Sequence, residues 1–290
     1  PQRIMMWSSG LAVFSGSSDK MKTLKKVCSN IYLVFIFVLL YAPILTLMVL
    51  SFNQSKSRAR WGGFTTRWYT ELFQNEEILL AFRNTMVIAF LSALVATLIG
   101  LCACMAMNNM KKRWRSLFMG IANIPMLNAE IVTGISLMLV FLVIGNFLSH
   151  FDRELPFGFW TVLIGHITFN IPYTILSIMP KLRQTSRYTY EAALDLGATP
   201  FYAFYKTTLP DLMPGILSGF LLAFTMSLDD FVITHFVKGA GFDTLSTKIY
   251  TEVKKGIKPE MYALSTLLFL AVLILLLLSN YRPKRRKKAD

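Results

Sequence analysis

Six long apolar runs dominate this sequence, and each one is long enough to cross a lipid bilayer as a helix. They cover residues 31–50, 84–107, 117–148, 160–180, 211–238 and 262–281. A spanning helix needs about 20 predominantly apolar residues, and in hydrocarbon only helices or closed barrels pair every backbone polar group. The composition agrees, with 54% hydrophobic residues, 16% charged residues and a mean hydropathy of +0.50. The sequence therefore predicts an all-α, polytopic integral membrane protein with six transmembrane helices.

Lysine and arginine residues fall mainly on one side of these six runs. The net charge of +14 would suit a nucleic-acid-binding protein, but the basic residues cluster beside the apolar runs and do not follow an amphipathic face. The N-terminus, the connections at 111–116 and 181–210 and the C-terminal tail carry 19 of them, against 10 in the other connections. Positive charge marks the cytoplasmic side of membrane proteins. We therefore expect both termini in the cytoplasm and no nucleic-acid partner.

The expected organisation is one six-span domain with short terminal segments. Residues 1–30 form a cytoplasmic N-terminal segment, residues 31–281 the membrane domain, and residues 282–290 a basic cytoplasmic tail suited to anionic membrane lipid. The first run is too long for a signal peptide and lacks a small-residue cleavage site, so we expect it to be retained. Since the chain does not begin with methionine, Met21 is a candidate natural start, with residues 1–20 as an upstream extension.

The connection between the fourth and fifth runs contains a short polar segment, "EAALDLGATP". Residues 187–196 are rich in good helix formers, and Gly197 stands where a left-handed C-terminal cap belongs. Thr199 followed by Pro200 is the pattern of a helix start. The sequence predicts two short helices that meet at an elbow, one in the cytoplasm and a second, aromatic-rich one at the membrane interface. Such a rigid protrusion suits the docking of a soluble partner, and the alternative is a structured loop without one.

This segment resembles the EAA loop of the permease subunits of type I ABC importers. The family pattern is Glu-Ala-Ala, three residues, Gly, nine residues, Ile, one residue, Leu-Pro, and only the isoleucine position, here Thr207, departs from it. The matching residues are Glu191, Ala192, Ala193, Gly197, Leu209 and Pro210. The resemblance implies the type I importer permease fold. It also implies that the loop 187–210 docks into a cytoplasmic ATPase and couples ATP hydrolysis to movement of the spans.

A wider resemblance, from about residue 31 to the last run, points to the C-type permease subunits of spermidine/putrescine importers. It rests on "SFNQS", "WGGFTTRWYTELFQN", "AEIVTGISLMLVF", "SLDDFVITHFVKG" and "LSTKIYTEVKKGIKPEMYALSTLL". The departures are Asn128 and Ala129 in place of a Ser-Pro pair, and His235 and Lys238 at places expected to be less charged. These departures could alter the choice of substrate.

The wider resemblance also implies partners and a location. The chain would form half of a polyamine pathway in the bacterial cytoplasmic (inner) membrane. Its partners would be a second permease subunit, an ATPase dimer that binds the ATP, and an extracytoplasmic substrate-binding protein. No cofactor is implied for this chain itself.

Three acidic residues stand inside apolar runs: Glu130 in the third, and Asp229 and Asp230 in the fifth. A charge placed in hydrocarbon costs about 2.5 to 3.5 kcal/mol on insertion scales, so each carboxylate must face protein, water or a cation. A polyamine pathway needs carboxylates for the ammonium groups and aromatic walls for the methylenes, and Phe224 and Phe231 lie nearby. On an unbroken helix, adjacent aspartates point about 100° apart, so one of them should face the pathway. The alternative is structural: the carboxylates cap a broken helix or pair with a basic group of a partner subunit.

The sequence contains no pattern of an enzyme or a metal centre. It has no phosphate-binding loop of the G-x-x-x-x-G-K-[ST] type and no nucleophile motif, so we expect no catalytic residues and an energy supply from a partner. His150, His166 and His235 lack ligand spacing, and the three cysteines form no disulfide framework. Two readings remain open, a permease for polyamines or another small solute in an ATP-driven importer, and a secondary transporter driven by ions. The coupling loop and the absence of an inverted-repeat signature favour the first.

Overall fold

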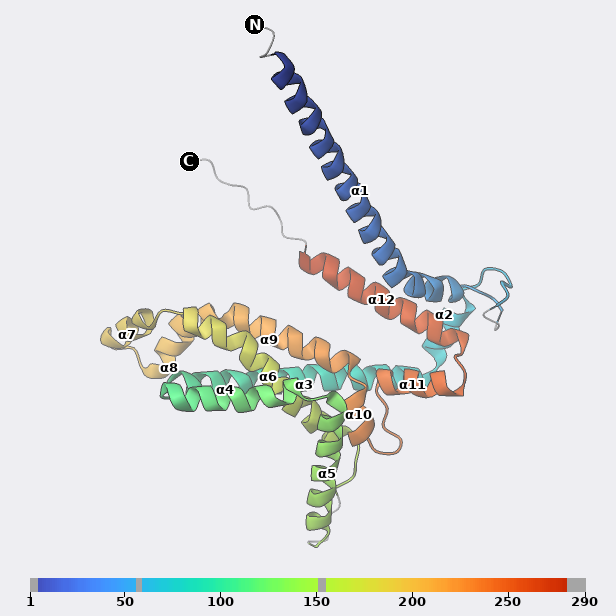
Figure 1. The fold of residues 1–290 in the computed structure, drawn as a ribbon. Helices are drawn as coiled ribbons and strands as arrows, with labels where there is room; N and C mark the ends of the chain where they lie inside the picture. Colours follow the sequence, from blue (N-terminus) through green and yellow to red (C-terminus); the bar gives the residue numbers. More distant parts are fainter. Residues whose placement is uncertain (1–4, 56–58, 151–154, 281–290) are drawn as a thin grey trace. The chain divides into compact units, whose positions relative to one another are not determined.

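The computed structural model describes residues 5–55, 59–150 and 155–280, and the long elements of that part of the chain are all helices (Figure 1). It divides into two compact units, residues 1–74 with 257–290 and residues 75–256. The first unit contains α1 (Met5–Leu50), α2 (Arg67–Gln74) and α12 (Pro259–Asn280). The second contains α3 (Glu76–Asn108), α4 (Lys112–Leu127), α5 (Glu130–Ser149), α6 (Phe159–Gln184), α7 (Arg187–Asp195), α8 (Pro200–Ala203), η1 (Phe204–Thr208), α9 (Leu209–Asp229), α10 (Val232–Val237) and α11 (Leu245–Lys255).

Five helical segments of the described residues are long and apolar enough to cross a membrane. They are Cys28–Leu50, Glu76–Asn108, Glu130–Ser149, Phe159–Gln184 and Pro200–Asp229. The sixth predicted span, 262–281, falls on α12, which is not one of these five. The predicted tail 282–290 lies outside the described residues.

Two of the predicted spans are wrong in one respect, because each is broken by a short extended stretch. The run 117–148 divides into α4 and α5 at Asn128 and Ala129, whose ψ angles are 150° and 135°. The run 211–238 divides into α9 and α10 at Asp230, whose ψ angle is 123°. Both breaks occur at or beside a polar residue, and a hydropathy window averages across such a residue without registering the end of a helix.

The first unit is organised around Asn53, in the loop between α1 and α2. The Asn53 side chain donates to the Arg60 carbonyl at 2.9 Å and accepts from the Gly62 N–H at 2.8 Å. Its own carbonyl accepts from the Trp68 indole N–H at 2.7 Å. Asn53 and Trp68 are both buried, so these bonds fix the loop and the amphipathic helix α2 in one conformation.

The core of the second unit is the contact of α3, α6 and α9, which meet through small residues. A Cβ added at Gly100 would lie 2.2 Å from the Thr174 hydroxyl, and one at Gly219 would lie 3.4 Å from the Thr174 Cα. Helices that associate in a membrane commonly bring their backbones together in this way. α7 and α8 lie at one end of this unit, and α10 and α11 lie toward the other (Figure 1).

Candidate functional site

The two helix breaks meet at one cavity of about 260 Å³. The end of α4 and the start of α5 form one wall, the end of α9 and the start of α10 form another, and Phe169 and Tyr173 of α6 complete the lining. Non-helical backbone at membrane depth is tolerated where it is buried in protein or lines a cavity, and broken helices form the binding sites of many transporters. The breaks therefore mark this cavity as the candidate site.

Asp230 forms the structural link across the second break. Its carboxylate accepts hydrogen bonds from the backbone N–H groups of Ile233 at 3.3 Å and Thr234 at 2.8 Å, and from the Thr234 hydroxyl at 2.8 Å. These N–H groups belong to the first turn of α10, where no helical partner exists for them. The carboxylate thus caps α10, and negative charge is favourable at that end of a helix.

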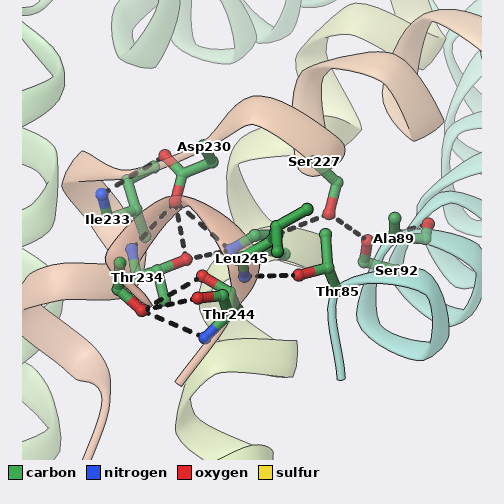
Figure 2. Close-up of polar contacts among 11 residues, drawn as sticks. Thr85, Ala89, Ser92, Ser227, Asp230, Ile233, Thr234, Thr244 and Leu245 are labelled. Atoms are coloured by element: carbon green, nitrogen blue, oxygen red, sulfur yellow. Dashed lines mark hydrogen bonds and ion pairs between the residues drawn. The ribbon is translucent and has the colours of Figure 1, made fainter. Parts of the chain in front are cut away.

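A buried polar chain connects Asp230 to α6 and α3. The His166 Nε2 lies 2.8 Å from the Thr234 hydroxyl and 3.3 Å from the Asp230 carboxylate, and its Nδ1 lies 2.5 Å from the Ser227 hydroxyl. The Ser227 hydroxyl in turn lies 3.1 Å from the Ser92 hydroxyl, and Figure 2 shows these two side chains pointing toward one another. Each ring nitrogen of His166 thus has a polar partner, Ser227 at Nδ1 and Thr234 with Asp230 at Nε2. The chain therefore joins α10, α6, α9 and α3 through one continuous set of buried polar contacts.

Helix α10 is held in place by apolar contacts as well as by this polar chain. Ile233 and Val237 belong to a buried cluster with Ile88, Phe141, Val162 and Phe169. Gly134 of α5 leaves space for Phe236, since a Cβ at this glycine would lie 2.8 Å from that ring. α10 is thus fixed against α3, α5 and α6, which fixes the wall of the cavity.

The predicted pathway residues occupy different positions around this cavity. Glu130, Asp229, Asp230 and Phe231 all line it, whereas Phe224 does not and instead stacks on Phe220 at a centroid distance of 6.2 Å. Glu130 stands in the first turn of α5 and Asp229 at the end of α9, and both are exposed. Among the residues that the structure describes, no lysine, arginine or histidine pairs with either of these two. The two aspartates do not share a helix, so the expected divergence of 100° is wrong: one caps α10, and the other faces the cavity.

Helix α11 is anchored to α3 beside this region. The Leu245 N–H donates to the Thr85 hydroxyl at 2.8 Å (Figure 2). Thr244 and Thr247 form a capping box at the start of α11. Lys248 of α11 also pairs with Glu77 of α3. These bonds keep α11 in a fixed register on α3.

Segment 187–210 has the predicted elbow. α7 ends in a Schellman motif: the Gly197 N–H donates to the Leu194 carbonyl at 2.9 Å, the Ala198 N–H donates to the Ala193 carbonyl at 3.1 Å, and Gly197 has φ +85°. The Thr199 hydroxyl accepts from the Tyr202 N–H at 3.4 Å, and Pro200 opens α8. The predicted left-handed cap at Gly197 and the predicted helix start at Thr199 and Pro200 are both confirmed.

The remainder of segment 187–210 differs from the expectation. The second short helix is not separate, because residues 204–208 form a π-helical turn that continues into α9. Thr207 lies in this turn, and its hydroxyl donates to the Ala203 carbonyl at 2.7 Å. Threonine hydroxyls inside helices commonly pair with the carbonyl of the preceding turn, and this bond holds the Thr207 side chain against the segment. The residue that departs from the family pattern thus has a structural role.

The outer face of segment 187–210 is apolar and exposed. Tyr188, Leu196 and Phe201 expose 82%, 89% and 80% of their surface. Glu191 and Ala192 are exposed on the same short helix, and Ala193 and Leu209 are half-buried. A groove of about 730 Å³, lined in part by Glu191 and Phe201, runs between this segment and the ends of α3 and α6. An exposed apolar patch rimmed by polar groups is typical of a protein interaction site.

Sequence reasoning missed the partners of Asp230. His166, Ser227, Ser92 and Thr234 stand in apolar helices, and all are less than 4% exposed. The available signal was the isolation of each polar side chain in an otherwise apolar run, since a buried polar group requires a partner. Among the described residues, no group of three or more histidine, cysteine or acidic side chains could hold a metal ion.

The comparisons with known proteins agree with this architecture. The family model described as binding-protein-dependent transport system inner membrane component matches residues 96–283. The chain therefore belongs to that family. It is 35% identical over 259 residues, covering 89% of this chain and 95% of the relative, to the Escherichia coli K12 spermidine/putrescine transport system permease protein PotC.

Other relatives and solved structures extend the comparison. The Escherichia coli K12 putrescine transport system permease protein PotI is 38% identical over 87% of this chain and 89% of its own. A PotC homolog of Mycoplasma pneumoniae is 32% identical over 93% of this chain and 96% of its own. The crystal structure of a bacterial ABC transporter for alginate matches with a TM-score of 0.68 at 20% identity over 88% of this chain and 93% of that one. A second alginate transporter structure, with a periplasmic protein bound to alginate pentasaccharide, matches with a TM-score of 0.70 at 19% identity over 93% and 97%.

These findings define the class of protein. The chain has the fold of an ABC importer permease and is a multi-pass membrane protein. It is a transport subunit and not an enzyme, as its relatives are permease subunits of transport systems.

Proposed function

We propose that this chain forms half of the translocation pathway of an ATP-driven importer for polyamines such as spermidine and putrescine. The observation that carries the proposal is the cavity between the two helix breaks, into which Glu130 and Asp229 place carboxylates that are paired with no cation among the described residues. The names of the relatives, which are polyamine permeases, support the same substrate class.

The chemistry of the cavity suits a linear polycation. An ammonium group that leaves water loses solvation, and a fixed carboxylate in surroundings of low dielectric compensates for this loss far better than it would in water. Phe231, Phe169 and Tyr173 supply aromatic walls against which methylene groups and ammonium groups both bind favourably. Asp230 does not serve as a free carboxylate, since its lone pairs are occupied by α10 and His166. The substrate therefore faces two carboxylates and an aromatic surface.

Segment 187–210 supplies the proposed link to ATP hydrolysis. Its exposed apolar face and the C-terminal cap at Gly197 make a rigid protrusion that can transmit force to α9, into which it continues without a loop. The ATP would be bound by a separate ATPase dimer docked on this segment, which the charge count places in the cytoplasm with both termini. A second permease subunit and an extracytoplasmic binding protein would complete the importer in the bacterial inner membrane.

The test is uptake by the complete importer reconstituted in vesicles, with radiolabelled spermidine, putrescine, an amino acid and a neutral sugar as substrates. We expect ATP-dependent uptake of the polyamines alone. Glu130→Gln and Asp229→Asn should each reduce the initial rate about tenfold, because each removes one charge-assisted contact to an ammonium group. Glu76→Gln removes an exposed carboxylate that lies outside the cavity and serves as the matched control.

Two results would overturn the proposal. Uptake of another solute in preference to the polyamines would assign the permease to a different substrate. Polyamine uptake that is equally fast in the two cavity variants and in the control would remove the cavity from the pathway.

A further inference from the structure

A short aromatic series leads from the cavity to the exposed side of α11. Phe231, which lines the cavity, contacts Tyr250 at a centroid distance of 4.5 Å and His235 at 5.2 Å. His235 and Tyr250 also contact each other edge to face at 6.0 Å. Tyr250 retains 37% of its surface exposed, so its ring is open to solvent on one side and continuous with the cavity wall on the other.

Lys254 occupies that open side. Its ammonium nitrogen lies 4.7 Å from the centroid of the Tyr250 ring, within the range of a cation–π contact. Among the described residues, no carboxylate pairs with Lys254, whereas Lys238 pairs with Asp243 and Lys248 pairs with Glu77 and Glu252. The ring face of Tyr250 is thus the place where this unpaired ammonium group rests.

The chemical identity of the lysine side chain makes this contact informative. A lysine side chain is a primary ammonium group on four methylene groups, which is also the aminobutyl end of putrescine and of spermidine. A ring face that binds the ammonium group of lysine can therefore bind the aminobutyl ammonium group of a polyamine through the same cation–π contact.

We propose that the Tyr250 ring face is a binding site for a primary alkylammonium group, occupied by Lys254 in this conformation, and that a polyamine displaces Lys254 there before it enters the cavity. The inference rests on the proposed function, since it assigns a further contact to the same substrate. Phe231 would pass the ammonium from the Tyr250 ring toward the carboxylate of Asp229. Lys254 acts as a tethered competitor, because its ammonium group occupies the ring face until a polyamine displaces it.

The competition predicts the direction and size of the effect of removing Lys254. A cation–π contact at an exposed site makes the state with Lys254 on the ring about 2- to 5-fold more populated than the state with a free ring. A competitor raises the apparent dissociation constant by one plus this ratio, so Lys254 weakens polyamine binding by about 3- to 6-fold. Lys254→Met retains the length and the apolar stem of the side chain and should lower the dissociation constant for putrescine by that factor. Lys255→Met is the matched control, because Lys255 is exposed on the same helix and contacts no ring.

A double-mutant cycle separates competition from a general effect of charge. In the Tyr250→Leu background the ring site is absent, so Lys254→Met should leave the dissociation constant unchanged. In the Tyr250→Phe background the ring face is retained, so the 3- to 6-fold decrease should persist. The measurement is equilibrium binding of radiolabelled putrescine to the purified, assembled importer without its binding protein, beside polyamine uptake by the unmodified importer.

The outcomes keep this inference apart from the proposed function. If the unmodified importer takes up polyamines but Lys254→Met and Lys255→Met alter binding equally, the ring site is overturned and the proposed function stands. The same conclusion holds if the Lys254→Met effect survives Tyr250→Leu. If the unmodified importer takes up no polyamine, both proposals fail together.

Discussion

Replacing Asp230 by asparagine should destabilise the permease, although the two side chains have nearly the same shape. The Asp230 Oδ2 accepts from the Thr234 N–H and hydroxyl, each at 2.8 Å, and lies 3.3 Å from the His166 Nε2. In asparagine, an NH₂ group replaces one carboxylate oxygen, and this NH₂ group cannot accept a hydrogen bond from the Thr234 and His166 donors. The single remaining oxygen can accept from only some of these donors. An unsatisfied buried donor costs about 1 to 3 kcal/mol. The Thr234 hydroxyl can rotate to another acceptor and so avoids part of this cost, and we therefore expect Asp230→Asn to lower the free energy of unfolding by about 2 to 3 kcal/mol in total.

Asp229→Asn is the neighbouring control and should show the opposite behaviour. Asp229 is exposed in the cavity and makes no hydrogen bond to α10, so the variant should retain its stability and lose about tenfold in polyamine uptake. Thermal unfolding of the purified complex is the assay for Asp230→Asn, whose midpoint should fall by about 4 to 12 °C.

A double-mutant cycle with His166→Gln completes the test of this arrangement. The two changes should combine to less than the sum of their separate effects, because they disrupt one network. Equal stability of the Asp229 and Asp230 variants, or strictly additive effects in the cycle, would refute the capping role.

Three further predictions concern segment 187–210, the topology and α11. Gly197→Asp should uncouple ATP hydrolysis from transport while leaving the protein inserted, since φ +85° costs a residue with a side chain about 1 to 2 kcal/mol; transport-coupled ATPase activity at the unmodified rate would contradict this. Ser246→Cys should react with an impermeant thiol reagent added outside, and Thr199→Cys only after the membrane is opened; the reverse pattern would overturn the proposed orientation. Lys248→Met should cost more than the ~0.5 kcal/mol of an exposed pair, because Lys248 contacts the buried Glu252 as well as the largely exposed Glu77. The hydrogen bond to Glu77 raises the pKa of Lys248, so its stabilisation should be complete below about pH 10 and lost above it; unfolding midpoints that fall with pH equally in both proteins would contradict it.

Local sequence patterns predicted the structural features that depend on a few adjacent residues. Gly197, Thr199 and Pro200 fix the elbow because a left-handed cap, an N-cap and a first-turn proline are each determined within one helical turn. The apolar runs likewise located the long helices, because crossing hydrocarbon imposes a length and a composition on each segment.

The features that the sequence did not reveal depend on contacts between distant segments. Nothing in the spacing of His166 and Asp230, 64 residues apart, indicates that they meet. The capping of α10 by Asp230 is itself local, through the N–H groups of Ile233 and Thr234, but the buried histidine that completes the site comes from a distant helix. A capped broken helix was one alternative for these carboxylates, and Asp230 confirms it, but the boundaries of the apolar runs did not locate the breaks because Asn128 and Asp230 interrupt runs that remain apolar on average. The cavity is formed only when both breaks come together beside α6, so the separate roles of Glu130, Asp229 and Asp230 could not be assigned from the sequence.

The central claim is that the cavity between the two helix breaks is the path of the polycation, and a cysteine at Thr133 tests it most directly. Thr133 lines the cavity one turn after Glu130, and the exposed Cys28 and Cys102 would first be replaced by serine. The rate of modification by a thiosulfonate that carries a trimethylammonium group would be compared with the rate for a neutral reagent of similar size. We expect the cationic reagent to react faster because two carboxylates attract it, and spermidine to slow both reactions during ATP turnover. Equal rates that spermidine leaves unchanged would contradict the account.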